Sequence, residues 1–379
     1  MVDSPKEIPE LTEAQIREVV EKLYGLNVRK IKTFSGYFDK NYYIEVDDQF
    51  SNQNILRLCP EGYVFKVVNS LDSKNTDMFA AQIKIMKRLS ENNFPVQAPV
   101  LTSSGVYYSM ERVYANGVLQ KDAKEHTKFS EFMVRIVTFI PGTIFDEVND
   151  VTPELLFEIG ATCARMDRVI EDIECKMPQT IWDLTQAYRV RKYMHAIADP
   201  IRRQLVSDVF TDLESVLTHF QKLKKVMIHG DFSEQNILID TVIDTDGNKV
   251  ARLSGILDFG CINTSYRVVD VAIMMAYCSS SVAVANFDVL EVCAQCLAGY
   301  LSYAPLNDLE MSMVPVLVAA RYAQSLVMGA HAYSRDPSND YVLVTARRGW
   351  IQLAELRKYT KEDLLIRLKE RISIISNGQ

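Results

Sequence analysis

The sequence predicts an α+β fold, with a small β-rich lobe in the first third of the chain and a larger, mainly helical lobe after it. Short runs of β-branched and aromatic residues are typical of the first part, whereas apolar residues at helical spacing are typical of the second. Between the two parts, Pro141-Gly142 interrupts both patterns. We therefore expect one lobe over 1–138, a hinge over 139–142 and a second lobe over 143–379.

In the first lobe, Thr12 to Gln15 reads as a capping box, which predicts an amphipathic helix that ends near Gly25. A second helix is predicted over Asp77–Leu89, from apolar residues that recur every three to four positions. The remaining regular segments of the lobe are four predicted strands, at Val28–Phe34, Tyr42–Val46, Tyr63–Val68 and Phe132–Phe139. These elements predict a small sheet with one inserted helix.

In the second lobe, Thr152 followed by Pro153 indicates a helix start, because proline is favoured at the first helical position. A hairpin of two apolar strands is predicted at Ile237–Ile239 and Leu253–Leu257. Helical patterns fit seven further ranges, which are 183–195, 199–220, 267–279, 285–302, 308–331, 336–356 and 361–375.

The composition limits the possible partners. The formal net charge is -7 and no basic block is present, so a nucleic-acid partner is not expected. The longest apolar stretch, Met313–Ala330, contains Arg321 and Gln324, which favours a core helix over a membrane span. The first ten residues lack the apolar core of a signal peptide. We expect a cytoplasmic protein with no membrane partner.

The seven cysteines are scattered and odd in number, unlike the framework of a disulfide-rich secreted protein. Cys293 and Cys296 form a C-x-x-C pair, but no second pair or histidine cluster accompanies them. Structural zinc takes four ligands. We therefore expect both to be small apolar residues on one face of a helix.

The most specific pattern runs from His229-Gly230-Asp231 to Asn236 and is followed by Asp258-Phe259-Gly260. Phosphoryl transfer requires an acceptor hydroxyl held in line and metal ions that neutralise the phosphate oxygens. Asp231 is the candidate base for the hydroxyl proton. Asn236 and Asp258 are candidate Mg²⁺ ligands, at the ends of the two hairpin strands. The alternative is a hairpin whose polar residues merely cap turns.

A nucleoside triphosphate needs contacts for its phosphates. Lys66, in the third predicted strand, is the candidate for the α- and β-phosphates, with a solvated strand lysine as the alternative. Such a lysine usually has a carboxylate partner on the following helix. Here the helix offers Gln82, whose amide is a candidate to orient Lys66 by hydrogen bonding, and the sequence leaves the partner of Lys66 open.

The loop between the first two strands, which contains Ser35 and Gly36, is the candidate phosphate cradle, although a plain hairpin turn is equally compatible with it. The nucleotide base is expected at the end of the last strand. There the backbone of Thr138, Phe139 and Ile140 would read the purine edge, which does not distinguish ATP from GTP.

These motifs resemble the aminoglycoside phosphotransferase and choline kinase superfamily, and the likeness is closer still to the hydroxylysine kinase family. The likeness spans about Glu13 to Glu355. The stretches that carry it are Val134–Gly142, Leu155–Asp167, Gly255–Gly260, Arg321–Met328 and Asp340–Trp350. The segment Cys261–Arg267 departs from the more acidic version of the family, which leaves acceptor recognition there open.

The resemblance implies a protein-kinase-like bilobal fold and transfer of the γ-phosphoryl group of GTP, or ATP, to the side-chain hydroxyl of 5-hydroxy-L-lysine. The products would be 5-phosphohydroxy-L-lysine and GDP, in lysine degradation. By position, Asp231 would be the base, Asn236 and Asp258 the Mg²⁺ ligands, and Lys66 the phosphate contact.

A hydroxylysine acceptor carries two ammonium groups and one carboxylate, so its site needs acidic and basic groups. Arg321 is the candidate carboxylate contact, with a structural ion pair as its alternative. Asp183 and Trp182 are candidate ammonium contacts. The acceptor site is also expected to include Tyr266, Arg267 and Gln324. Asp270 is expected to brace the catalytic loop, and His229 to pack beneath it.

Two other functions remain open from sequence. The first is a kinase of the same superfamily with another acceptor, such as choline, ethanolamine, homoserine or an aminoglycoside; the few aromatics near the motif disfavour choline. The second is a nucleotide-binding pseudokinase scaffold, which the sparse phosphate loop favours and the intact Asp231, Asn236 and Asp258 disfavour.

Overall fold

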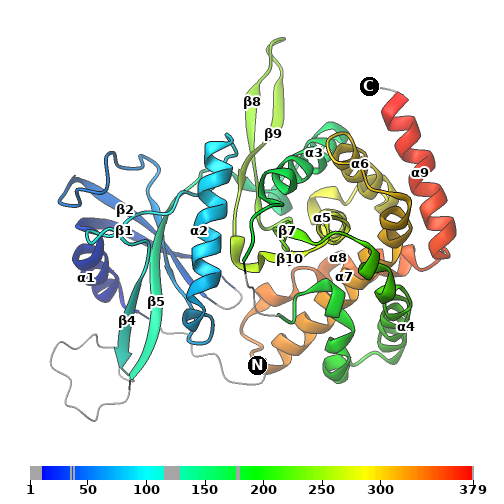
Figure 1. Ribbon diagram of the computed structural model, residues 1–379, viewed down its shortest axis with the longest axis horizontal. Coiled ribbons are helices and arrows are strands. Elements are labelled where there is room, and N and C mark those ends of the chain that lie inside the picture. The colour runs from blue at the N-terminus through cyan, green and yellow to red at the C-terminus, as the bar shows by residue number, and fades with distance from the viewer. Residues whose placement is uncertain (1–10, 35, 37–38, 115–128, 176–179, 378–379) are drawn as a thin grey trace. The chain divides into compact units, whose positions relative to one another are not determined.

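The computed structural model describes residues 11–34, 36, 39–114, 129–175 and 180–377. The chain divides into two compact units (Figure 1). Unit 1 consists of Met1–Ser90 and Val96–Pro141, and unit 2 of Glu91–Pro95 and Gly142–Gln379. The first is built mostly around a sheet and the second mostly from helices, which confirms the predicted fold class.

Unit 1 contains a five-stranded antiparallel sheet in the order β1-β2-β3-β5-β4. Its strands are β1 (Leu26–Phe34), β2 (Lys40–Phe50), β3 (Tyr63–Val67), β4 (Ser109–Tyr114) and β5 (Phe129–Thr138). The sequence did not predict the edge strand β4. Its charged residues Glu111 and Arg112 hide the strand pattern, and both find partners only in the folded sheet and on α1 (Glu13–Tyr24).

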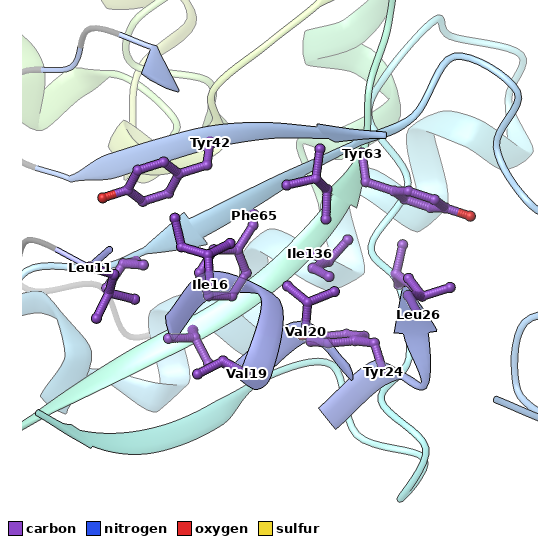
Figure 2. Packing of buried hydrophobic residues seen from close by; sticks show 14 of the residues in the cluster. Leu11, Ile16, Val19, Val20, Tyr24, Leu26, Tyr42, Tyr63, Phe65 and Ile136 are labelled. Atoms are coloured by element: carbon purple, nitrogen blue, oxygen red, sulfur yellow. The ribbon is translucent and has the colours of Figure 1, made fainter. Parts of the chain in front are cut away.

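Helix α1 packs on one face of this sheet (Figure 2). Thr12 and Gln15 form the predicted capping box, and Gly25 ends the helix in the left-handed conformation. The apolar face of α1 includes Ile16 and Val20, which pack against Phe65 and Ile136 of the sheet. Burial of these side chains provides the main driving force for this half of unit 1.

Helix α2 (Thr76–Glu91) belongs to the other face of the sheet. Side chains alternate along a strand, so Lys66 of β3 and Arg135 of β5 point away from the α1 cluster. These two residues are direct neighbours across the strand pair. The Arg135 guanidinium lies 4.8 Å from the ring centre of Phe79 on α2. Two cations therefore share this face with α2.

Unit 2 contains the helices α3 (Pro153–Ile170), α4 (Pro200–Val216), α5 (Arg267–Ser280), α6 (Val289–Leu301), α7 (Asp308–Arg335), α8 (Ala346–Leu356) and α9 (Lys361–Asn377). Helices α3 and α6 lie side by side (Figure 1). A Cβ on Gly160 of α3 would lie 1.9 Å from the backbone oxygen of Cys296. A Cβ on Gly299 of α6 would lie 2.0 Å from that of Phe157. The two backbones therefore touch where only glycine fits.

Three helix predictions in this unit were wrong in detail. The range 183–195 forms the 3-10 segment η3 (Leu184–Ala196), and 199–220 ends as the 3-10 segment η4 (Leu217–Lys222) after α4. The range 336–356 divides into η7 (Asp340–Leu343) and α8. Asp336 accepts hydrogen bonds from the backbone and hydroxyl of Ser338, which ends α7 with a local turn.

Unit 2 also holds short strands that position the site. They are β6 (Thr143–Ile144), β7 (Val226–Ile228), β8 (Ile237–Ile243), β9 (Lys249–Ile256) and β10 (Asn263–Ser265). Strands β8 and β9 form the predicted hairpin (Figure 1). Strand β7 pairs with β10, and β6 with β8. Strands of two or three residues leave no periodic pattern in a sequence, so β6, β7 and β10 were not predicted.

Helix α7 is the one helix of the described residues that is long and apolar enough to cross a membrane, but 94% of its apolar window is buried inside the protein. This burial agrees with the core helix predicted there. Cys293 and Cys296 are buried in α6 as expected, and all seven cysteines are free thiols.

Candidate active site

The loop from His229 to Asn236 lies between β7 and β8 in unit 2. Gly230 has a φ of +77°, and a Cβ there would lie 2.3 Å from the backbone oxygen of Cys261. Only glycine permits this approach. The backbone N–H of Leu257 donates to the oxygen of Asn236 at 2.8 Å, which joins the loop to the segment that carries Asp258.

Asp231 has a charged or polar group at each carboxylate oxygen. Its Oδ1 accepts from Nη2 of Arg321 at 3.0 Å, and its Oδ2 accepts from Nδ2 of Asn236 at 2.9 Å. Burial raises the pKa of Asp231 above its ordinary value; the Arg321 guanidinium opposes this rise, and the charge of Asp258 adds to it. The side chain is still 25% exposed, so an acceptor can reach it.

The candidate metal ligands carry oxygen atoms suited to Mg²⁺. Nδ2 of Asn236 donates to both the backbone oxygen and Oδ2 of Asp231, so the amide oxygen is the atom that remains for a cation. Asp258 has a left-handed φ of +54°, and its Oδ1 accepts from the backbone N–H of Gly260 at 3.0 Å. The carboxylate and amide pair therefore fits a divalent metal bound with nucleotide phosphates.

Asp270 and His229 support the loop from below, as predicted. The two oxygens of Asp270 accept the backbone N–H groups of His229 and Gly230, at 3.0 and 2.8 Å. The His229 ring contacts the backbone oxygen of Leu257 through Nε2 at 3.1 Å and lies 4.9 Å from the ring of Phe259. Both residues are fully buried, so they hold the loop and do not contact an acceptor.

Arg321 is only 1% exposed, and it forms an ion pair inside the protein. Besides Asp231, its guanidinium donates to the backbone oxygen of Trp182 at 3.2 Å and to Oε1 of Gln324 at 2.9 Å. Gln324 in turn donates to the backbone oxygen of Ile181 at 2.7 Å. The geometry therefore supports the structural ion pair, the alternative that the sequence left open, in which Arg321 holds the carboxylate of Asp231.

The other predicted acceptor residues are partly engaged elsewhere. Asp183 caps η3, where its Oδ1 accepts from the backbone and hydroxyl of Thr185. The ring of Trp182 lies 5.4 Å from the Arg321 guanidinium. Tyr266 is buried and stacks on Phe220 at 4.7 Å, and Arg267 pairs with Glu171. Tyr266 and Arg267 are therefore structural residues here, because their partners lie in the helical packing.

Of the predicted nucleotide residues in unit 1, Ser35 lies outside the described residues. A Cβ on Gly36 would lie 2.7 Å from the backbone oxygen of Asp39. Gln82 is buried, and its amide has no hydrogen-bond partner among the described residues, so it does not bond Lys66 as expected.

The backbone groups expected to read a purine are partly used inside unit 1. The N–H of Thr138 donates to the oxygen of Ala98, and the N–H of Phe139 donates to the oxygen of Gly62. These donors are not free in this structure, which corrects the expectation for both. Ile140 follows Phe139 directly. The Phe139 ring lies 4.8 Å from that of Tyr43 and 6.3 Å from that of Phe34, and the three rings form an apolar surface.

Sequence reasoning missed two acidic residues around the catalytic loop. Asp146, in the 3-10 segment η2 (Phe145–Glu147), accepts from Gln235 Nε2 at 3.2 Å and from Ser281 Oγ at 2.8 Å. Glu234 is 2% exposed, and burial raises its pKa well above the ordinary value. Both positions look like unremarkable polar residues, because their partners are distant in the sequence.

A comparison with protein families matches residues 43–306 to the phosphotransferase enzyme family. Among curated proteins, a hydroxylysine kinase of Xenopus laevis is 33% identical, over 93% of this chain and 92% of its own length. A hydroxylysine kinase of Mus musculus is 28% identical, over 92% and 90%.

Solved structures share the fold at low sequence identity. An amicoumacin kinase in complex with AMP-PNP, Ca²⁺ and its ligand has a TM-score of 0.63 at 15% identity, covering 93% of this chain and 97% of its own. A microcompartment-associated aminopropanol kinase has a TM-score of 0.62 at 16% identity, covering 93% and 99%. With the carboxylate and amide arrangement around Asp231, these matches establish that the chain belongs to the phosphotransferase enzyme family, groups with the hydroxylysine kinases and is a kinase that phosphorylates a hydroxyl group.

Proposed function

We propose that this kinase transfers the γ-phosphoryl group of GTP, or ATP, to the side-chain hydroxyl of 5-hydroxy-L-lysine. The products are 5-phosphohydroxy-L-lysine and GDP, or ADP, in a step of lysine degradation. The observation that carries the proposal is the 33% identity to a hydroxylysine kinase over almost the whole of both chains. The arrangement of Asp231, Asn236 and Asp258 supports the reaction type.

Asp231 is the proposed base. The hydroxyl oxygen of the acceptor forms a bond to the γ-phosphorus as the bond to the bridging β–γ oxygen breaks, and the hydroxyl proton passes to Asp231. Arg321 and Asn236 orient its two oxygens. Asn236 and Asp258 would hold Mg²⁺, which when bound neutralises the phosphate oxygens.

Each unit contributes proposed contacts of its own. In unit 1, Lys66 is the proposed phosphate contact, with Gly36 in the covering turn, and the Phe34, Tyr43 and Phe139 rings are proposed to pack on the base. In unit 2, Asp183 is the proposed contact for an acceptor ammonium group. Its Oδ1 caps η3, so Oδ2 is the oxygen assigned to that contact.

We also propose a cytoplasmic location. Seven free thiols suit a reducing compartment, and the one helix of the described residues that is long and apolar enough to cross a membrane is buried inside the protein. The acidic balance of the chain, with a formal net charge of -7, gives no support for a nucleic-acid partner.

A second candidate keeps the reaction and changes the acceptor to a smaller amino alcohol. An aminopropanol kinase shares the fold with a TM-score of 0.62, which makes this acceptor class one to test. That likeness concerns the fold, whereas the likeness to hydroxylysine kinases extends to the sequence. Hydroxylysine is therefore the first acceptor to test.

The test measures release of GDP or ADP with Mg²⁺, with GTP and ATP offered in parallel against hydroxylysine, lysine, aminopropanol, choline, ethanolamine and homoserine. Lysine is the matched control, because it lacks only the hydroxyl. Release with hydroxylysine but not with lysine supports the acceptor, and the faster of the two donors settles donor preference. Turnover of another amino alcohol with none of hydroxylysine would overturn the acceptor and leave the kinase class intact.

A further inference from the structure

Beneath the catalytic loop, two helices bring together buried groups that the proposed reaction does not use. Cys163 and Asp167 come from α3, and Asp270 comes from α5. The Cys163 sulfur, one carboxylate oxygen of Asp167 and one of Asp270 all lie within 4.8 Å of one another. All three residues are fully buried. Two carboxylates this close inside a protein cannot both carry a full charge without a cation.

Asp270 is the member that already acts as an acceptor at both oxygens. Both of its oxygens are acceptors, one for the backbone N–H of His229 and the other for that of Gly230. A carboxylate that accepts two N–H groups is stabilised in its charged form. A metal ion at this cluster would compete with those two N–H groups for the same oxygens.

In the part of the chain that the structure describes, Asp167, unlike Asp270, has a hydrogen-bond donor at only one of its two oxygens. Its Oδ2 accepts from the Tyr300 hydroxyl at 2.6 Å, whereas its Oδ1 is buried without a hydrogen-bond partner among the described residues. The groups that face it are Cys163 on its own helix, Asp270 and Arg267 on α5, and Tyr300 on α6. The cation among them, Arg267, is already paired with Glu171.

We propose that Asp167 is a neutral carboxylic acid whose proton is donated to Asp270, which makes Asp167 a positioning residue for the catalytic loop. A proton on Asp167 turns an unpaired buried acceptor into a donor and removes the like-charge repulsion. Burial and the charge of Asp270 raise the pKa of Asp167 well above its ordinary value, which agrees with this protonation. Burial also raises the pKa of the Cys163 thiol and of the Tyr300 phenol, so both are neutral.

The consequence is a chain of hydrogen bonds that ends one residue before the base. It runs from Tyr300 to Asp167, on to Asp270 and then to the backbone of His229 and Gly230. The close crossing of α3 and α6 at Gly160 and Gly299 keeps Tyr300 next to Asp167. Movement of Asp270 would shift the loop and with it Asp231.

Three variants separate the roles of the two acids. The Asp167→Asn amide can donate to Asp270 and accept from Tyr300, so kcat should stay within about threefold of wild type. Asp167→Leu keeps the branched shape without a donor and should lower kcat about tenfold. Asp270→Asn places an NH₂ against a backbone N–H and should lower kcat at least about a hundredfold. Tolerance of Asp270→Asn, or equal damage from Asn and Leu at 167, would overturn the assignment.

A second test, the pH dependence of the free energy of unfolding, does not depend on the identity of the acceptor. In the unfolded chain Asp167 ionises near its ordinary pKa, whereas the folded protein retains the proton, so the unfolded state binds fewer protons as pH rises. The free energy of unfolding therefore falls between the unfolded and folded pKa values of this group. Asp167→Asn removes that dependence.

The measurement is urea unfolding of wild type and Asp167→Asn from mildly acidic to neutral pH, followed by tryptophan fluorescence. Both tryptophans, Trp182 and Trp350, lie in unit 2. The unfolding constant of wild type relative to the variant should grow by up to about tenfold per pH unit above pH ~4. A ratio that stays constant with pH would overturn the neutral acid, whether or not hydroxylysine is the acceptor.

Discussion

Arg321 and Asp231, 90 residues apart in the sequence, form an ion pair with 3.0 Å between Nη2 and Oδ1. The arginine is buried and has two further hydrogen bonds, so its geometry is fixed before an acceptor arrives. A buried arginine can hold a carboxylate in one orientation and keep it ionised. The pair therefore links the C-terminal third of the chain to the reacting group.

Replacing Arg321 with methionine should make activity more sensitive to acid. Asp231 must be ionised to accept a proton, and without the guanidinium its pKa rises further, because the largest of the effects that oppose burial and Asp258 is lost. The acid limb of the kcat/KM profile should move to higher pH. Arg321→Lys, which retains the charge, is the control. A methionine profile parallel to that of wild type would show that Arg321 does not control the base.

Asp231→Asn should abolish turnover while nucleotide binding persists. The amide keeps the size of the side chain but cannot take the hydroxyl proton, a loss of about 10²- to 10⁴-fold. Product release and calorimetric titration with GTP and Mg²⁺ measure the two properties separately. Equal loss of both would assign Asp231 to nucleotide binding.

Asp258→Asn should weaken the response to Mg²⁺. Removal of the charged oxygen lowers affinity for a hard divalent cation, so the Mg²⁺ concentration for half-maximal rate should rise and excess Mg²⁺ should restore part of the rate. Asp240→Asn, at an exposed carboxylate on the same hairpin, is the matched control. An unchanged Mg²⁺ dependence in the Asp258 variant would exclude this residue as a ligand.

Gly160→Ala should destabilise unit 2 by about 1–3 kcal/mol or more, because the new methyl group would overlap the backbone of α6. Gly349→Ala in α8 is the control. Its Cβ would meet only side-chain atoms, at 3.2 to 3.4 Å, and alanine favours a helix. Urea unfolding monitored by tryptophan fluorescence compares the two. Similar stabilities would mean that α3 and α6 can separate without loss.

Local sequence patterns predicted those elements whose structure depends on residues close to one another in the sequence. The spacing of Asp231, Asn236 and Asp258 identified the catalytic hairpin, and the capping box at Thr12 identified α1. Contacts between distant segments were not predictable in this way. Nothing in the sequence near Arg321 specifies that its partner is Asp231, and nothing near Asp167 indicates the proximity of Asp270.

Among the individual elements that were predicted wrongly or missed, η3 and strand β4 have a related explanation. Strand β4 carries charged residues that become favourable only beside β5 and α1. The 3-10 geometry of η3 depends on the cap at Asp183 and on packing against α7, since its sequence also suits an ordinary helix. Periodicity reports which face is buried but not which neighbour covers it.

The position of Arg321 in the sequence also affects how the enzyme is made. A ribosome adds roughly 5–20 residues each second, so the 90 residues between Asp231 and Arg321 take about 5–18 s to synthesise. During that interval the loop with the base has left the peptidyl-transferase centre, whereas the arginine that orients it has not been translated. In the nascent chain, the proposed base Asp231 therefore gains the arginine that orients it only after α7 emerges, late in synthesis.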